Sequence, residues 1–250
     1  MKKILILILL AMAVSATAQT PEQLMQQGND AYAKAEYPAA IQHYNAVLQA
    51  GQQSADLYYN LGNAHYRQEE YGLAILNYER ALRLNPRFTE ARENLDLANT
   101  KTEDEIAPLP EIFILQWAHN VVAWFSPTGW RIIFLCLLAV LGALTVLFVL
   151  RDDYLWRKWT LIGGSVTAVL LLLSLACTIS SSVRYNRHDG AIVTVPMAVV
   201  KSSPESGSVD KLILHEGTKV KIDETVGDWH KVRIADGNTG WLPQAEITII

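Results

Sequence analysis

The side chains most able to do chemistry are scattered along this 250-residue chain. The six histidines stand at His43, His65, His119, His188, His215 and His230. None has the spacing to a second histidine, a cysteine or a carboxylate that is typical of metal ligands. The serines between positions 202 and 208 form a hydrophilic stretch, not the tight turn of a hydrolase nucleophile. We therefore expect no catalytic residue, no metal site and no cofactor, and we do not expect an enzyme.

The two cysteines, Cys136 and Cys177, lie in long apolar stretches. The rest of the chain offers no disulfide framework and no zinc spacing. If the two stretches run antiparallel in a membrane, both thiols lie near the same leaflet, which would permit a cross-link. A buried cysteine more commonly packs as a small hydrophobic side chain, and both interpretations stay open.

The residues best suited to binding lie in a segment that repeats itself after 34 residues. The small and aromatic positions of the first copy, Gly28, Ala40, Tyr44 and Val47, match Gly62, Ala74, Tyr78 and Ala81 in the second. Longer runs also match, because residues 28–32 read Gly-Asn-Asp-Ala-Tyr and residues 62–66 read Gly-Asn-Ala-His-Tyr. A 34-residue helix–turn–helix unit with this pattern resembles the tetratricopeptide repeat (TPR). The glycines are expected where the two helices of a pair approach closely.

The resemblance implies two repeats and a capping helix that runs from Thr89 to about Glu103. Two repeats are near the lower limit for stability, because each unit buries its apolar face only against a neighbour. We expect Leu95 and Leu97 to cover the open end of the stack. Docking onto a partner or onto the membrane-spanning part would add to this cover.

In such a stack the first helices of the pairs line a concave groove that binds peptides or proteins. The resemblance places the following residues on that groove: Asn29, Tyr32, Tyr59, Asn63, Tyr66 and Arg67. In one interpretation the asparagines bond the main chain of a ligand. In the other, the tyrosines pack inside the stack and the asparagines bond nearby backbone. Met25, Glu90 and Asn94 stand where a clamp for carboxyl-terminal acidic peptides needs basic residues, so we do not expect that ligand.

After about residue 190 the hydrophobic period changes to two, which predicts strands. Strands are expected at 219–223 and 230–234, and Asp236-Gly237-Asn238 predicts a hairpin turn. These runs, together with Gly-Trp pairs, resemble bacterial SH3-like domains, which are small barrels that commonly bind peptides or cell-wall material. Residues 200–204, taken as the first strand, lack the arginine usual there. Trp229 and Trp241 would form a ligand platform on the barrel or pack within it.

Three apolar stretches predict how the chain meets a membrane. Residues 1–18 have the lysines, apolar run and small residues of a signal peptide, with an uncleaved anchor as the alternative. Residues 132–150 and 160–182 hold no charged side chain and are long enough to span a bilayer. The loop between them is basic, whereas the 24 residues before Arg131 hold no lysine or arginine. The positive-inside rule puts this loop in the cytoplasm and both flanking parts in the periplasm.

The spans and the charge exclude several classes of protein. Neither span contains an ionisable residue of the kind that transporters and pumps place in the membrane, so we expect an anchor in membrane lipid. Between residues 19 and 106 there are 13 acidic and 7 basic side chains. No basic stripe for nucleic acid is present. Residues 112–124 are apolar and aromatic, and we expect a helix there that lies in the outer interface.

The expected architecture is multidomain, with an all-α repeat part, a two-helix transmembrane hairpin and an all-β barrel. The expected boundaries are 1–18 for the signal peptide, 19–106 for the TPR domain, 107–130 for the interfacial linker, 131–182 for the two transmembrane helices and 190–250 for the SH3-like domain. In this order the modules resemble the BatE family of the bacterial aerotolerance operon, including the Ser-Pro-Thr-Gly-Trp run at 126–130.

That resemblance implies an inner-membrane stress-tolerance complex with other Bat-type membrane proteins, which carry von Willebrand A or TPR domains. We therefore expect a non-catalytic scaffold whose TPR domain recruits partner proteins. The alternative is a sensor of cell-wall material or peptides in which the barrel is the binding part.

Overall fold

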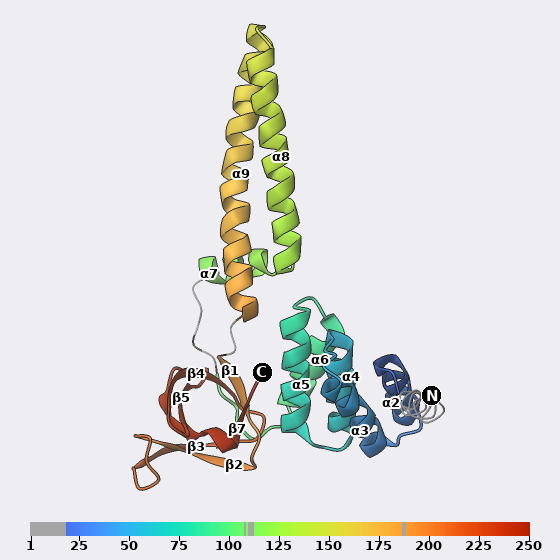
Figure 1. The fold of residues 1–250 in the computed structure, drawn as a ribbon. Coiled ribbons are helices and arrows are strands. Elements are labelled where there is room, and N and C mark those ends of the chain that lie inside the picture. Colours follow the sequence, from blue (N-terminus) through green and yellow to red (C-terminus); the bar gives the residue numbers. More distant parts are fainter. Residues whose placement is uncertain (1–18, 108, 110–112, 187–188) are drawn as a thin grey trace, which may run out of the picture.

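The computed structural model describes residues 19–107, 109, 113–186 and 189–250, so the expected signal peptide lies outside the described residues. The chain forms a curved row of short helices, a long helical hairpin and a curled antiparallel sheet (Figure 1). This confirms the multidomain fold class expected from the sequence.

Five helices form the repeat region. They are α2 (Pro21–Ala33), α3 (Tyr37–Gln49), α4 (Ala55–Arg67), α5 (Tyr71–Leu84) and α6 (Thr89–Asn99). Thr20 and Ser54 begin the first helix of each pair, and their hydroxyls accept the main-chain N–H groups of Gln23 and Leu57. Ala35 and Glu69, 34 residues apart, both turn the chain with a positive φ. The 34-residue period of the sequence is therefore also a period of backbone conformation.

The helices of each pair touch at a glycine, as expected. A Cβ atom on Gly28 would lie 2.4 Å from Cε1 of Tyr44, and one on Gly62 would lie 2.7 Å from Cδ1 of Tyr78. Both tyrosines are almost completely buried. The tyrosine ring thus occupies the space that the missing side chain leaves, which explains why glycine and tyrosine recur together.

The open end of the stack differs from the sequence-based expectation. Helix α6 ends at Asn99 instead of near Glu103. Leu95 is buried as expected, but Leu97 is 48% exposed and does not cover the end of the stack. Ile75 and Leu95 instead pack in one apolar cluster with Ile192 and Ile250 of the C-terminal sheet. The structure therefore covers the stack with the other folded part of the same chain.

Two long apolar helices form the hairpin, α8 (Pro127–Leu150) and α9 (Tyr154–Asn186). Both are long and apolar enough to cross a membrane, and their side chains are mostly exposed. They pack along each other in an antiparallel pair (Figure 1). Cys136 and Cys177 are free thiols in this hairpin. The helices extend beyond the apolar runs because Ser126 caps α8 and polar turns continue α9 at both ends.

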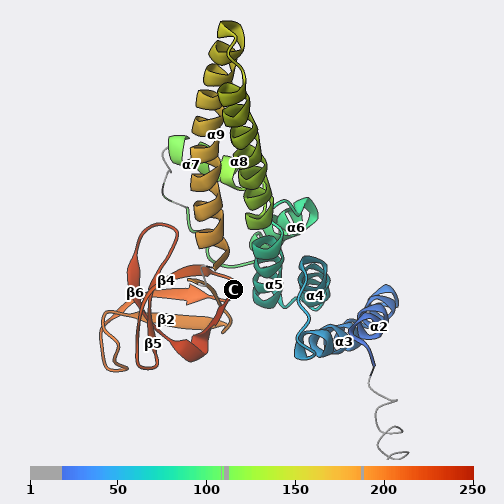
Figure 2. The same cartoon turned by 45° about the horizontal axis from the view of Figure 1, so that its top comes forward.

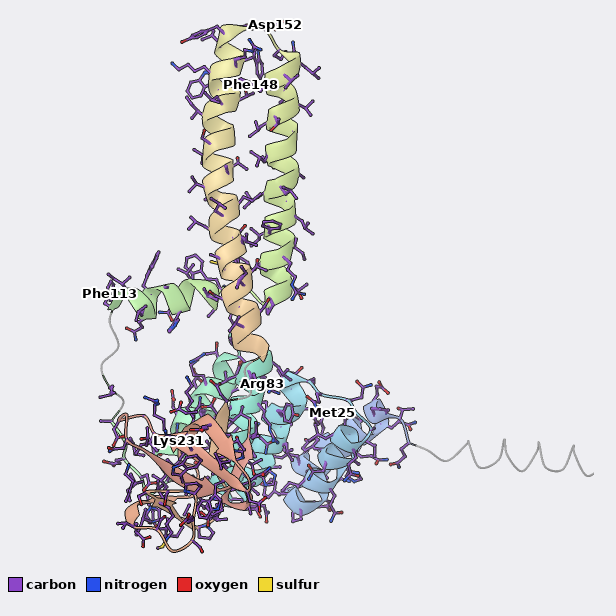
Figure 3. All side chains as sticks on the ribbon, turned by 60° about the vertical axis from the view of Figure 1, so that its left-hand side comes forward. Met25, Arg83, Phe113, Phe148, Asp152 and Lys231 are labelled. Carbon is purple, nitrogen blue, oxygen red and sulfur yellow. The ribbon has the colours of Figure 1, made fainter. Side chains whose placement is uncertain are left out.

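A short helix, α7 (Phe113–Val122), lies across the base of the hairpin (Figure 3). Phe113 and Trp117 on it are largely exposed. The indole N–H of Trp130 donates to the carbonyl oxygen of Val122 at 3.0 Å, which ties α7 to the first turn of α8. This arrangement is that expected of a helix lying in a membrane interface.

Seven strands form the C-terminal sheet, in the order β3-β2-β6-β5-β4-β1-β7. They are β1 (Gly190–Val193), β2 (Met197–Lys201), β3 (Asp210–His215), β4 (Lys219–Val226), β5 (Trp229–Arg233), β6 (Thr239–Pro243) and β7 (Ile247–Ile249). The sheet curls around one apolar core and forms the expected small barrel (Figure 1). The stretch 200–204 is not a first strand, because it holds the end of β2 and the start of a loop.

The barrel packs on α5 through a close contact between their main chains. A Cβ atom on Gly72 would lie 3.1 Å from the main-chain nitrogen of Gly217, and Gly217 itself has a φ of +88°. Arg80 and Arg83 donate to the main-chain oxygens of Ile249 and Ile250, each at 2.8 Å. Figure 2 shows the C-terminal end of the chain between the barrel and α5. The two folded parts thus form one continuous body beneath the hairpin.

Candidate functional site

A pocket of about 250 Å³ opens on the groove side of the repeat region. Its walls are the following residues of α2, α4, α5 and α6: Tyr32, Tyr59, Asn63, Tyr66, Arg67, Tyr78, Asn94 and Leu97. Five of the six residues expected on the groove thus surround one pocket. Asn29, the sixth, lies one turn before Tyr32 on α2 and does not line it.

Hydrogen bonds among asparagines and tyrosines build the floor of this pocket. The Oδ1 atom of Asn63 accepts the Tyr78 hydroxyl at 2.8 Å and the Asn94 amide at 2.8 Å. One repeat earlier, Oδ1 of Asn29 accepts the Tyr44 hydroxyl at 2.9 Å and the Asn60 amide at 3.1 Å. Each amide oxygen therefore links the second helix of its own repeat to the first helix of the next.

These bonds correct the interpretation in which the asparagines bond nearby backbone. Their oxygens bond side chains of the stack instead. An amide oxygen has two lone pairs, and both are engaged at Asn29 and Asn63. The amide NH₂ groups carry the remaining donors. A ligand in the groove therefore meets asparagine donors that the stack holds in a fixed orientation.

The tyrosine rims of the groove also follow the repeat. Tyr32 packs edge-on against Tyr37 with ring centroids 5.4 Å apart, and Tyr66 packs in the same way against Tyr71 at 5.4 Å. Such pairs add stability beyond the burial of their area. Tyr32, Tyr59 and Tyr66 stay half-buried and keep part of each ring open to the groove.

Arg67 is the cation of the pocket and is exposed. A hydrogen bond with Tyr32, assisted by the phenols of Tyr37 and Tyr66, raises the pKa of Arg67 above its ordinary value. Burial raises the pKa of the neighbouring stack residue Tyr44 to about 12. The pocket thus combines one guanidinium with phenols and amides.

Three wall residues, Tyr78, Asn94 and Leu97, were not among the six residues expected on the groove. Asn94 carries a signal that could have been read, because it follows Asn63 by the same 31 residues that separate Asn60 from Asn29. Leu97 gave no such signal. It was expected to cover the stack, and only its exposure beside the pocket shows otherwise.

On the barrel, the two tryptophans expected as a platform lie on neighbouring strands. Trp229 stands opposite Pro243 and Trp241 stands opposite Lys231 in the pairing of β5 with β6. These positions alternate with the buried His230 and Leu242, so they belong to the outer face of the sheet. The Lys231 Nζ atom lies 6.0 Å from the centroid of the Trp241 ring. Both rings are partly exposed, and neither belongs to the apolar core of the barrel.

The histidines take structural roles where the structure describes their contacts. Nδ1 of His65 lies 2.6 Å from the Glu70 carboxylate, in the turn between α4 and α5. His215 lies 2.7 Å from Asp104, a residue of the segment that leaves α6. Within the described ranges no group of three or more histidine, cysteine or acidic side chains could hold a metal ion.

Comparison with protein families identifies the modules. Residues 55–88 match the tetratricopeptide repeat, residues 28–69 match a TPR repeat, and residues 194–248 match the bacterial SH3 domain. No curated protein matches the chain. TPR repeats and a bacterial SH3 domain are therefore present, and both are non-catalytic binding modules. TPR repeats suggest protein partners, and the bacterial SH3 domain suggests cell-wall binding.

Proposed function

We propose that this protein is a membrane-anchored scaffold whose TPR groove captures a segment of a partner protein. The observation that supports this most directly is the pocket of about 250 Å³ formed by tyrosines, asparagines and Arg67. Aromatic residues and arginine are the types that carry most binding energy at protein interfaces. Asn63, whose oxygen is fixed by the stack, offers its amide donors to the main chain of an extended peptide.

The surroundings of the pocket favour a peptide over a small molecule as its ligand. The groove runs along α2, α4 and α6, and the pocket is a widening of it, not a closed cavity. Arg67 is its one cation among the lining residues, in a region that is otherwise rich in acids. We infer that the captured segment places an acidic or carbonyl group against Arg67.

The finer proposal concerns place and partners. Following the resemblance to the BatE family, we propose that the hairpin spans the bacterial inner membrane with the repeats and the barrel in the periplasm. The partners would be Bat-type membrane proteins with von Willebrand A or TPR domains, in a complex that serves aerotolerance. The domain limits 19–106, 131–182 and 190–250 are part of this proposal.

The test uses the full chain, because the repeats and the barrel share the apolar cluster of Ile75 and Ile192 and would expose it if separated. A photo-cross-linking residue placed at Leu97, beside the pocket, should give an adduct with the partner. The same probe at Leu73, which is exposed but does not line the pocket, should not. Equal adducts from both positions would contradict a groove-bound partner.

Arg67→Ala should weaken this capture by about 1–3 kcal/mol, the size of an interface hot spot. Lys34→Ala is the matched control, since Lys34 is an exposed cation at the end of α2 that does not line the pocket. Tyr66→Ala should have a similar effect on capture. If Arg67→Ala and Lys34→Ala reduce the adduct equally, the pocket is not the binding surface.

A second function, the sensing of cell-wall material, is supported by the outer face of the barrel. Trp229, Lys231 and Trp241 gather there on paired strands. We propose this face as the binding part in that alternative. Retention of the full chain on peptidoglycan that is lost in Trp241→Ala, with Arg67→Ala unchanged, would favour sensing over scaffolding.

A further inference from the structure

A cavity of about 890 Å³ lies where the repeat region, the hairpin and the barrel meet. Its walls come from the end of α5, the α7–α8 turn, Ser181 of α9, and strands β1 and β4. It is separate from the groove pocket, with which it shares no lining residue. Figure 3 shows Arg83, one of its lining residues, directly beneath the base of the hairpin.

The cavity lies at the level where the apolar part of the hairpin ends. Arg131 lines it and directly precedes the uncharged run 132–150, and Ser181 lines it at the end of the run 160–182. Phe125 also lines it and packs edge-on against Trp130 at 5.2 Å. Aromatic side chains at the ends of apolar spans mark the interfacial zone of a bilayer, where lipid headgroups lie.

Positive charge is concentrated around this cavity. Among the residues that the structure describes, five basic side chains and two acidic ones line it: Arg83, Arg92, Arg131, Lys219, Lys221, Glu79 and Asp189. The two acids pair with the two lysines, since Lys219 lies 2.7 Å from Glu79 and Lys221 lies 3.6 Å from Asp189. Three arginines remain, of which Arg83 donates one N–H to the main-chain oxygen of Ile250 at 2.8 Å and Arg92 donates one to that of Pro86 at 2.9 Å. In the part of the chain that the structure describes, no carboxylate side chain pairs with any of them.

The arginines come from three elements of the fold and converge on the same space. Arg83 lies on α5, Arg92 on α6 and Arg131 on the first turn of α8. Their concentration is unexpected in a repeat region with 13 acidic and 7 basic side chains. Guanidinium groups favour phosphate, which they bind through paired hydrogen bonds. The cavity also has apolar walls, among them Leu82, Leu84 and Val122.

We propose that this cavity binds the phosphate headgroup of an anionic phospholipid from the adjoining leaflet. The arginines would hold the phosphate, and the apolar walls would cover the glycerol and the first carbons of the acyl chains. A lipid fits better than free phosphate because of those apolar walls and the level of the cavity. The bound lipid would join the repeats, the hairpin and the barrel at their common boundary. This inference rests on the hairpin crossing a membrane and is independent of partner capture.

The test measures lipid retained by the purified full chain in detergent, by native mass spectrometry. Phosphatidylglycerol, phosphatidylcholine with the same acyl chains and inorganic phosphate are the three probes. We expect phosphatidylglycerol to be retained in preference to phosphatidylcholine. Arg131→Gln should reduce its affinity roughly fivefold, the usual effect of one basic residue at an anionic membrane surface. Arg157→Gln, which removes a cation at the opposite end of the hairpin, should leave the affinity unchanged.

Arg131→Lys keeps the charge and should restore most of the retention, which separates loss of charge from loss of fold. Equal retention of the two lipids, or an equal loss in Arg157→Gln, would overturn the proposal. Competition by inorganic phosphate as effective as that by phosphatidylglycerol would show that the site takes a soluble anion instead of a lipid.

Discussion

At the scale of single residues, the repeat region uses side chains in pairs that the 34-residue period reproduces. Tyr78 fills the space beside Gly62. Its hydroxyl donates a hydrogen bond to Asn63, the residue that follows Gly62 on α4. Tyr44 does the same beside Gly28 and Asn29. Glycine, asparagine and tyrosine therefore form one unit, in which each residue type depends on the other two.

Gly62→Leu should destabilise the repeat region by more than about 3 kcal/mol, because a side chain there overpacks a filled core. Tyr78 is almost fully buried and has no room to move away. Urea unfolding followed by circular dichroism measures the effect. Gly207→Leu is the control, since a Cβ atom at Gly207 meets nothing within 4 Å. Tyr66→Ala should cost far less than Gly62→Leu. If the two destabilise equally, Tyr66 belongs to the core and not to the groove.

Asp104 is the residue that ties the segment after α6 to the barrel. Its carboxylate accepts the His215 main-chain N–H at 2.7 Å and also contacts the His215 ring and the Thr218 hydroxyl. Burial would raise the pKa of Asp104, but the hydrogen bonds from His215 and Thr218 outweigh it and lower this pKa below its ordinary value of 3.8. The bond with Asp104 raises the pKa of His215 above 6.5.

The stability that the contact between Asp104 and His215 contributes should therefore decrease at both low and high pH. The Asp104 contribution is present above pH 3.8 and is lost as the pH falls through its lowered pKa. The His215 contribution is complete below pH 6.5 and is lost as the pH rises through its raised pKa. Hydrogen exchange at residues 102–106 and 215–218, corrected for intrinsic rates, should be slowest between these limits.

Asp104→Asn should weaken this pH dependence and speed exchange between the two limits, because an amide is a weaker acceptor for these donors. The remaining dependence would come from Glu103, which lies 3.2 Å from Nε2 of His215. Asp96→Asn, which changes an exposed acid on α6, should leave the exchange profile as it is. A pH profile that is unchanged in Asp104→Asn would assign the dependence to another group.

At the scale of elements, α5 has three partners. It packs on α4 inside the repeat and on α6 after it, and its start meets the barrel, where Gly72 faces Gly217. Position 217 requires glycine for two reasons. Its φ is +88°, and a Cβ atom there would lie 2.6 Å from Cγ2 of Thr102. In the first repeat Pro38 stands at the position of Gly72. The second repeat thus departs from the first where it meets the barrel.

Gly72→Leu should separate the barrel from α5 without unfolding the repeat, because the new side chain points at Glu216 and Gly217. We expect faster hydrogen exchange in β1 and β7 and unchanged exchange in α4. Leu73→Val is the neighbouring control, since Leu73 is already exposed. Unchanged exchange in β1 and β7 in Gly72→Leu would show that the interface tolerates the side chain and does not depend on close backbone contact.

At the scale of the whole molecule, the hairpin joins two folded parts that lie on the same side of it (Figure 1). Two spans return the chain to the side of the membrane where it began. Because the barrel and the repeats are in contact, they lie on the same side of the membrane, which requires an even number of crossings. This agrees with the periplasmic placement of both parts that we propose. The basic loop after α8 then lies in the cytoplasm.

An accessible cysteine tests this topology. In a chain with Cys136 and Cys177 replaced by alanine, Asp153→Cys should react with an impermeant maleimide only after the inner membrane is opened. Ser206→Cys, in the barrel loop after β2, should react from the periplasm in intact spheroplasts. Labelling of Asp153→Cys by the external reagent in intact spheroplasts would invert the topology.

The features that depend on local periodicity could be predicted from the amino-acid sequence. The 34-residue repeat identified the helix pairs and five of the eight residues that surround the groove pocket. The period-two pattern identified the barrel. Uncharged runs of sufficient length identified both helices of the hairpin. These patterns can be read along the chain, because each reflects neighbours within one or two elements.

The contacts between the folded parts could not be predicted in this way and are known only from the three-dimensional fold. The cluster of Ile75 with Ile192, the bond of Asp104 with His215 and the cavity of three arginines each join residues far apart in the chain. Neither the repeat period nor the spacing of motifs in the sequence predicts such a contact, because the residues on each side of it already fit the pattern of their own helix or strand. Leu97 and Leu95 show the same limit at short range. Both are apolar residues of α6, and the packing of α6 against α5 and the barrel decides that one is buried and the other lines the groove.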